Sequence, residues 1–119
     1  MNLQYFSNND FRNATPPCSI EDMDKTFLHR LDVSRYHSGV PYIVNSAFRT
    51  LEHEKSKGRD GTSSHTKGMA VDLKATNARI KYKIVIGLLK AGFTRIFVYD
   101  WGIHVDCDPD KDQEVLNNY

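Results

Sequence analysis

Cysteine is scarce in this chain, which has only Cys18 and Cys107 among its 119 residues. A disulfide framework needs more cysteines in a shorter chain, and a structural zinc site usually offers them in pairs. Because Cys107 directly follows Asp106, the two side chains should point to opposite faces of a strand. We therefore expect a buried or half-buried thiol at Cys107 rather than a metal ligand. The sequence leaves a disulfide between the two cysteines open.

The chain also lacks an excess of charge and any long apolar run. Sixteen basic and fifteen acidic residues leave a formal net charge of +1, which gives no support for nucleic acid or an anionic membrane as a partner. No segment approaches the length needed to cross a bilayer, and the polar start Met1–Gln4 does not have the form of a secretory leader. We therefore expect synthesis in a cytoplasm and retention there unless something else releases the protein.

Length and composition predict one domain over residues 1–119, because this size and a hydrophobic fraction of 39% suit a single soluble core. A monomer is expected. Residues 1–18 are polar, carry aromatic anchors and end in two prolines, so we expect an irregular N-terminal arm packed on the domain. Residues 108–119 are polar too and are expected to form a surface extension.

Apolar spacing predicts two helices separated by short strands. Ser19 offers an N-cap for a helix from about Ile20 to His37, with Asp22 in the capping-box position. Thr76 or Asn77 can cap a second helix that ends at Gly92. Strands are expected at Tyr42–Ser46, up to Lys74, at Phe93–Tyr99 and at Ile103–Cys107, with a helical turn at Glu52–Ser56. The sum is a small α+β domain whose largely antiparallel sheet has helices on one face and a cleft on the other.

Two stretches place ionisable side chains opposite apolar ones. In residues 69–73, alternation turns Asp72 away from the apolar face, and His65 lies at the loop mouth that precedes this strand. In residues 102–106, the same alternation turns His104 away from the core. Two such strands can bring His65, Asp72 and His104 together. Two imidazoles and one carboxylate suit a single Zn²⁺ ion, and three protein ligands leave a fourth position for water.

The same residues carry a resemblance to a known family. The pattern Ser63-x-His65-x-x-Gly68-x-Ala70-x-Asp72, preceded by Ser46-x-x-Arg49 and followed by Ile-His-Val-Asp at 103–106, resembles the zinc D-alanyl-D-alanine carboxypeptidases of the hedgehog/D,D-peptidase type. More closely, the chain resembles the short single-domain peptidoglycan peptidases of bacteriophages, from about Phe6 to Lys111. The resemblance implies a hedgehog/D,D-peptidase-like fold with a zinc cleft.

The resemblance also implies a role for individual residues. His65, Asp72 and His104 would bind one zinc ion. Arg49 would hold a substrate carboxylate or the developing oxyanion, and Ser63 would hydrogen-bond the substrate or orient the site.

The general base is less clearly marked. Many members carry an acid three residues before the last zinc histidine, and Trp101 stands there instead. The candidates are Asp106 and Asp100, and strand alternation favours Asp106 because it shares the face of His104. The alternative role for Asp106 is to accept a hydrogen bond from a ligand imidazole.

The implied activity is zinc-dependent hydrolysis of a peptide bond in the stem or cross-link of bacterial peptidoglycan. It would be of the D,D-carboxypeptidase or endopeptidase type, in phage-derived lysis or remodelling of the cell wall after release from the host cytoplasm. The alternative hypothesis is a zinc-containing cell-wall binding or virion module without turnover. The glycine-containing loop at residues 57–64 is expected to gate the substrate, and the sequence leaves open which bond is cut.

Overall fold

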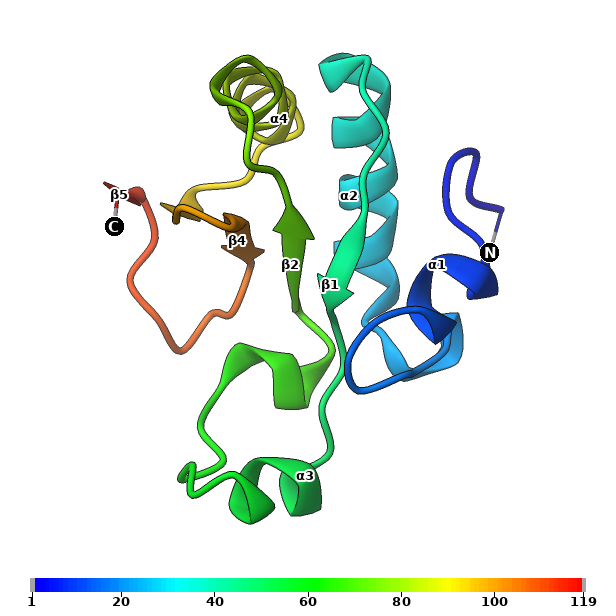
Figure 1. Ribbon diagram of the computed structural model, residues 1–119, viewed down its shortest axis with the longest axis vertical. Helices are drawn as coiled ribbons and strands as arrows, with labels where there is room; N and C mark the ends of the chain where they lie inside the picture. The colour runs from blue at the N-terminus through cyan, green and yellow to red at the C-terminus, as the bar shows by residue number, and fades with distance from the viewer. Residues whose placement is uncertain (1, 119) are drawn as a thin grey trace.

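The computed structural model describes residues 2–118, which are built around a five-stranded sheet in the order β1-β2-β4-β3-β5 (Figure 1). The strands are β1 (Val44–Ser46), β2 (Ala70–Lys74), β3 (Arg95–Val98), β4 (Gly102–Asp106) and β5 (Val115–Asn118). Every neighbouring pair is antiparallel except β3 and β5, which are parallel. The expected α+β class with a largely antiparallel sheet is confirmed.

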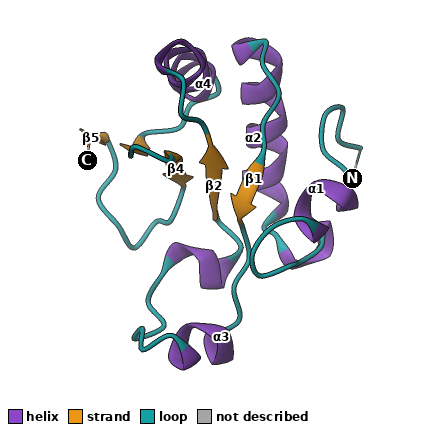
Figure 2. Ribbon diagram, viewed as in Figure 1, coloured by secondary structure: helices purple, strands orange, loops and turns teal. Residues whose placement is uncertain are grey.

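Two helices, α2 (Lys25–Ser38) and α4 (Ala78–Lys90), pack against each other beside the sheet (Figure 2). Asn77 accepts the backbone N–H groups of Arg79 and Ile80, so of the two predicted caps, Thr76 and Asn77, it is Asn77 that caps α4. Side chains of both helices and of the inward-facing strand positions are fully buried together: Leu28, Leu31, Ile84, Leu88, Val71, Leu73, Ile103 and Val105. This core fills one face of the sheet, and Asp72 and His104 lie on the opposite face.

The first long helix begins later than predicted. Ser19 does cap a helix with Asp22 in the capping box, but this helix is only the short 3-10 turn η1 (Ile20–Asp22). The chain then becomes extended at Met23, and α2 starts after Asp24, whose carboxylate accepts the N–H of Phe27 at 2.9 Å. The prediction of one helix from Ile20 to His37 is therefore wrong at its start, because Asp24 is a competing cap and burial of Met23 holds the chain extended.

Residues 2–18 and 108–118 contain secondary structure that the sequence did not predict. The N-terminal arm contains helix α1 (Asn8–Arg12), and Phe6 and Phe11 lie in the main core. The C-terminal extension contains β5, which pairs with the edge of β3. Short polar segments carry little local signal for either element, and here tertiary contacts supply the stability that the local sequence lacks.

The other expected elements are confirmed with shifted bounds. Strands β1, β3 and β4 lie within or next to the predicted ranges, and α3 (Leu51–Ser56) contains the predicted helical turn. Strands β3 and β4 pair as an antiparallel hairpin. Gly102 sits where β2 and β4 approach closely, since a Cβ atom there would overlap the carbonyl oxygen of Leu73. Both cysteines are free and half-buried, and burial raises the pKa of Cys107 to about 11.

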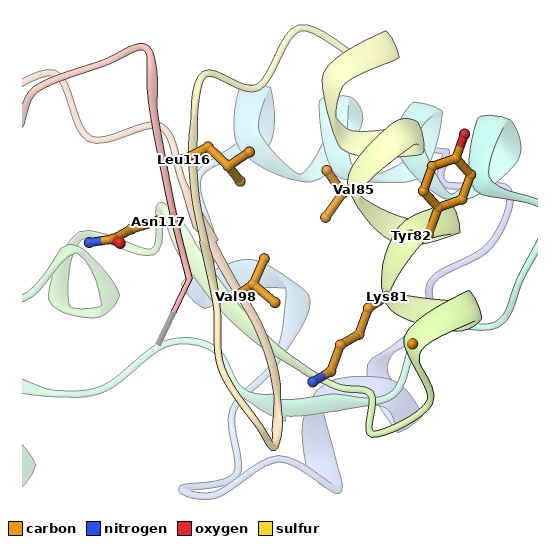
Figure 3. Close-up of a pocket in the computed structure, with 7 residues that line it drawn as sticks. Lys81, Tyr82, Val85, Val98, Leu116 and Asn117 are labelled. Carbon is orange, nitrogen blue, oxygen red and sulfur yellow. The ribbon is translucent and has the colours of Figure 1, made fainter.

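A cavity of about 420 Å³ lies between α4 and strands β3 and β5 (Figure 3). Val85 of α4 faces Val98 and Leu116 across it. Asn117 points the other way in this view, as strand alternation requires. None of the predicted metal ligands lines this cavity, so it is separate from the cleft that the sequence analysis expects. Within residues 2–118, no helix combines the length and apolar character that a membrane span requires.

Candidate metal centre

His65 lies on the short 3-10 helix η2 (Ser64–Lys67), directly before β2. Ser63 is the N-cap of this helix, and its hydroxyl accepts the backbone N–H of His65 at 3.2 Å. The His65 ring is buried, and its Nδ1 atom lies 2.6 Å from the carbonyl oxygen of Ala47. A carbonyl only accepts hydrogen bonds, so Nδ1 donates to it. In the neutral ring, Nε2 is then the nitrogen with the lone pair.

Gly68 makes the tight passage from η2 into β2. Its φ angle of 68° lies in the left-handed region that favours glycine. A Cβ atom at this position would also lie 2.6 Å from the carbonyl oxygen of Asp22. The glycine therefore lets the chain pass close to the backbone of η1 between His65 and β2, the strand that holds Asp72.

Asp72 and His104 are directly opposite each other on β2 and β4. His104 Nδ1 lies 2.8 Å from Asp72 Oδ1, and His65 Nε2 lies 3.4 Å from the same oxygen. One ligand atom from each of the three residues lies within 4.8 Å of the others. The structure thus brings together the imidazoles and the carboxylate that the sequence analysis predicts, on the sheet face opposite the core.

The protonation of this cluster is set by its own hydrogen bonds. Burial disfavours the charged form of Asp72, but hydrogen bonds from His104 and His65 outweigh it and hold the pKa of Asp72 well below its usual range. Burial likewise opposes a charge on His104, yet its contacts with Asp106 and Asp72 raise its pKa above the ordinary value. Each of the two shifts thus favours the charged form of its own side chain.

Arg49 borders the cluster from the segment that follows β1. Its Nη2 atom donates to Asp72 Oδ2 at 3.2 Å, its Nε to the Ser46 hydroxyl at 2.9 Å, and its Nη1 to Glu54 at 3.4 Å. Glu54 is fully buried in α3 and also pairs with Arg59 of the following loop at 2.6 Å. Burial raises the pKa of Glu54, but the hydrogen bonds and charges of the two arginines lower it overall. Arg49 is thus held in place by side chains on both sides of it.

Asp106 lies behind His104, on the side away from Asp72. His104 Nε2 is 2.7 Å from Asp106 Oδ2, and Arg95 donates to the same oxygen at 3.1 Å. The other oxygen accepts the backbone N–H of Asp108 at 3.2 Å. Asp106 is 1% exposed, so these partners account for its carboxylate oxygens in a buried position.

Asp100 lies apart from these contacts, in the exposed turn between β3 and β4. The carbonyl oxygen of Asp100 accepts a hydrogen bond from Lys81 at 3.2 Å. Trp101, which occupies the family position of the acid, stacks on Tyr99 with a centroid distance of 4.8 Å and is 40% exposed.

Several residues at the site were missed by the sequence analysis. Glu54 has the appearance of a solvated residue in a charged helical turn, and nothing local indicates its burial. Arg95 and Phe97 lie two residues apart on β3, so their side chains share one face of the strand. Phe97 is opposite His104, with ring centroids 5.8 Å apart. The hairpin register was the one available signal for these two residues, because it turns them to the face of His104.

The donor set at the site defines a class of protein. Two imidazoles and one carboxylate form a three-ligand site of the kind that hydrolytic zinc proteins use, and His65 has a lone pair directed to it. The family model of Peptidase M15 matches residues 6–108, which is most of the chain. This protein therefore belongs to the Peptidase M15 family, whose members are zinc-dependent peptidases. No curated protein matches the chain.

Proposed function

We propose that this protein is a zinc peptidase that cleaves a peptide bond in the stem or cross-link of bacterial peptidoglycan. The observation that carries the proposal is the convergence of His65, Asp72 and His104 in a chain of the Peptidase M15 family. The activity is of the D,D-carboxypeptidase or endopeptidase type, and the role is phage-derived lysis or remodelling of the cell wall. A single monomeric domain over residues 1–119 carries it.

In this proposal, His65 Nε2, a carboxylate oxygen of Asp72 and His104 Nδ1 hold the zinc ion. When bound, zinc supplies an acidified water and a Lewis acid for the peptide carbonyl. The Ala47 carbonyl fixes the ring orientation and the tautomer of His65, and Asp106 does the same for His104. Ser63 contributes by capping η2 and so orienting His65.

Arg49 is proposed to bind the substrate carboxylate or the oxyanion of the transition state. Its guanidinium already donates to Asp72, Ser46 and Glu54, and a guanidinium has further N–H donors for a substrate oxygen. Glu54 and Ser46 hold the group in advance, which lowers the reorganisation needed during the reaction.

Asp106 and Asp100 are the two candidates for the general base, as in the sequence analysis. The hydrogen bonds of Asp106 favour its supporting role, because they place it on the Nε2 side of His104 and engage both of its oxygens. Asp100 lies in an exposed turn at the end of the β3–β4 hairpin. Its availability to solvent keeps it as the second candidate.

The test uses purified peptidoglycan and the full chain. Wild type is expected to contain one zinc ion per chain and to release new amino groups, and mass spectrometry of the muropeptides identifies the bond. His65→Ala and His104→Ala should lose zinc and activity while staying folded. His29→Ala is the matched control, because His29 is exposed on α2 and should change neither property.

Two outcomes would redirect the proposal. Zinc in the wild type with no product from peptidoglycan would favour the alternative, a cell-wall binding or virion module without turnover. Full hydrolysis by His104→Ala would contradict the metal centre itself.

A further inference from the structure

We propose that Arg95 is a positioning residue for the metal centre, which acts on His104 through Asp106. The inference rests on the proposed function, since it concerns the zinc affinity of that site. Arg95 lies on β3, the strand next to β4 on the side away from the other two ligands. It contacts none of the three ligands in the hydrogen bonds and ion pairs of the described residues, so any effect on zinc must pass through a neighbour.

Asp106 is a buried carboxylate that needs partners for its charge. A carboxylate that is 1% exposed needs compensating partners, because its charge is poorly solvated there. His104 Nε2 at 2.7 Å is one partner, and Arg95 Nε at 3.1 Å is the other on the same oxygen. Arg95 brings a permanent positive charge, so the Asp106 oxygen that faces His104 has a cationic partner whatever the charge of His104.

Arg95 is itself held by contacts beyond Asp106. Its Nη1 atom donates to the carbonyl oxygen of Asp112 at 2.9 Å. Its guanidinium carbon lies 4.7 Å from the centroid of Phe97, whose ring centroid lies 5.8 Å from that of His104. Arg95 therefore contacts both of the side chains that fix the His104 ring, Asp106 at its edge and Phe97 beside it.

Together these contacts link Arg95 to Asp106 and Asp106 to His104, and so orient the His104 ring. With Nε2 held by a carboxylate that Arg95 keeps in place, Nδ1 is the nitrogen that faces Asp72 and would bind the metal. Removal of Arg95 leaves Asp106 buried without its cation, and the carboxylate is then free to move away from His104. The expected result is a weaker zinc site with the same three ligands.

The experiment is a double-mutant cycle on zinc affinity, measured by competition with a chelator. Arg95→Met is expected to weaken zinc binding by about tenfold, the lower end of the effect of losing an outer-shell partner. Asp106→Asn should weaken it by at least as much. The double variant should bind zinc no more weakly than Asp106→Asn alone, because Arg95 acts through Asp106. Arg79→Met is the matched control, since Arg79 is exposed on α4 and should leave the affinity unchanged.

The cycle separates positioning from a purely structural role. Zinc affinity within twofold of wild type in Arg95→Met, or effects that multiply in the double variant, would overturn the inference. If Arg95→Met does not fold, the double variant, which removes both charges, is compared with Asp106→Asn instead. A zinc affinity of the double variant that is a further tenfold below that of Asp106→Asn would also overturn the inference. A wild type that binds no zinc would refute the proposed function and this inference together, whereas tight binding that is indifferent to Arg95 refutes only the inference.

Discussion

Each imidazole of the cluster is oriented by the hydrogen bond that its other ring nitrogen makes. His65 Nδ1 faces a backbone carbonyl, which leaves Nε2 for the cluster, and His104 Nε2 faces Asp106, which leaves Nδ1. The two rings thus present different nitrogens to Asp72, with their centroids 5.3 Å apart. Residue identity alone does not determine this choice, because it depends on which acceptor lies behind each ring.

The role of Asp106 is tested at the residue scale by Asp106→Asn and Asp100→Asn. We expect Asp106→Asn to lower zinc affinity about tenfold or more, and to keep turnover within about tenfold of wild type once zinc is saturating. An amide oxygen still accepts from His104, so the ring stays oriented. Asp100→Asn should keep wild-type zinc affinity. The measurements are chelator competition and initial rates at several zinc concentrations.

A different result would assign the base to Asp106. If turnover of Asp106→Asn stays more than about a hundredfold low at saturating zinc, the carboxylate takes part in proton transfer.

At the scale of elements, α3 and the loop after it are joined to the site by one buried carboxylate. Glu54 pairs with Arg49 next to Asp72 and with Arg59 of the loop that was expected to gate the substrate. The backbone N–H of Arg59 also donates to the carbonyl of Glu54 at 2.9 Å. The start of this loop is therefore fastened to the same residue that holds Arg49.

This linkage predicts a pH dependence of stability. The folded protein lowers the pKa of Glu54 below its ordinary value of 4.5, so the carboxylate stabilises the fold above that pH and the contribution is lost as the pH falls through the lowered pKa. Glu54→Gln should therefore reduce the free energy of unfolding most at neutral pH, and the difference from wild type should shrink in acid. Denaturant unfolding at a series of pH values measures it.

Glu52→Gln is the control on the same helix, because Glu52 is exposed. A stability difference for Glu54→Gln that is the same at pH 7 and in strong acid would contradict the linkage.

At the scale of the whole molecule, the site joins segments far apart in the chain. His65 precedes β2, Asp72 lies within it, and His104 comes from β4 after the whole of α4 has intervened. A metal ion that binds all three stabilises the folded state because the unfolded chain offers no such arrangement. The zinc centre and the fold are therefore expected to be thermodynamically linked.

The linkage predicts a thermal shift. Zinc at about 100 times its Kd should add about 2.7 kcal/mol to the free energy of unfolding, which corresponds to a rise in Tm on the order of 10 °C for a domain of this size. Calorimetry in zinc and in chelator measures the shift. Equal Tm values under the two conditions would argue against a bound metal, and His65→Ala should abolish the shift.

The convergence of the three candidate ligands and the main elements were predictable because they depend on local patterns. Alternation in β2 and β4 turns Asp72 and His104 to one face, and the cap at Asn77 marks the start of α4. The start of α2 was predicted wrongly, because two candidate caps lie close together and the burial of Met23 decides between them.

The sequence by itself determined which side chains gather at the candidate metal centre, since strand periodicity and a left-handed glycine at position 68 are properties of the local chain. Tertiary structure alone decided which residues support these side chains. The buried pairing of Glu54 with two arginines, the support of Asp106 by Arg95 and the addition of β5 all join segments distant in sequence. Such contacts depend on packing and desolvation across the whole fold, and no local pattern of residues encodes them.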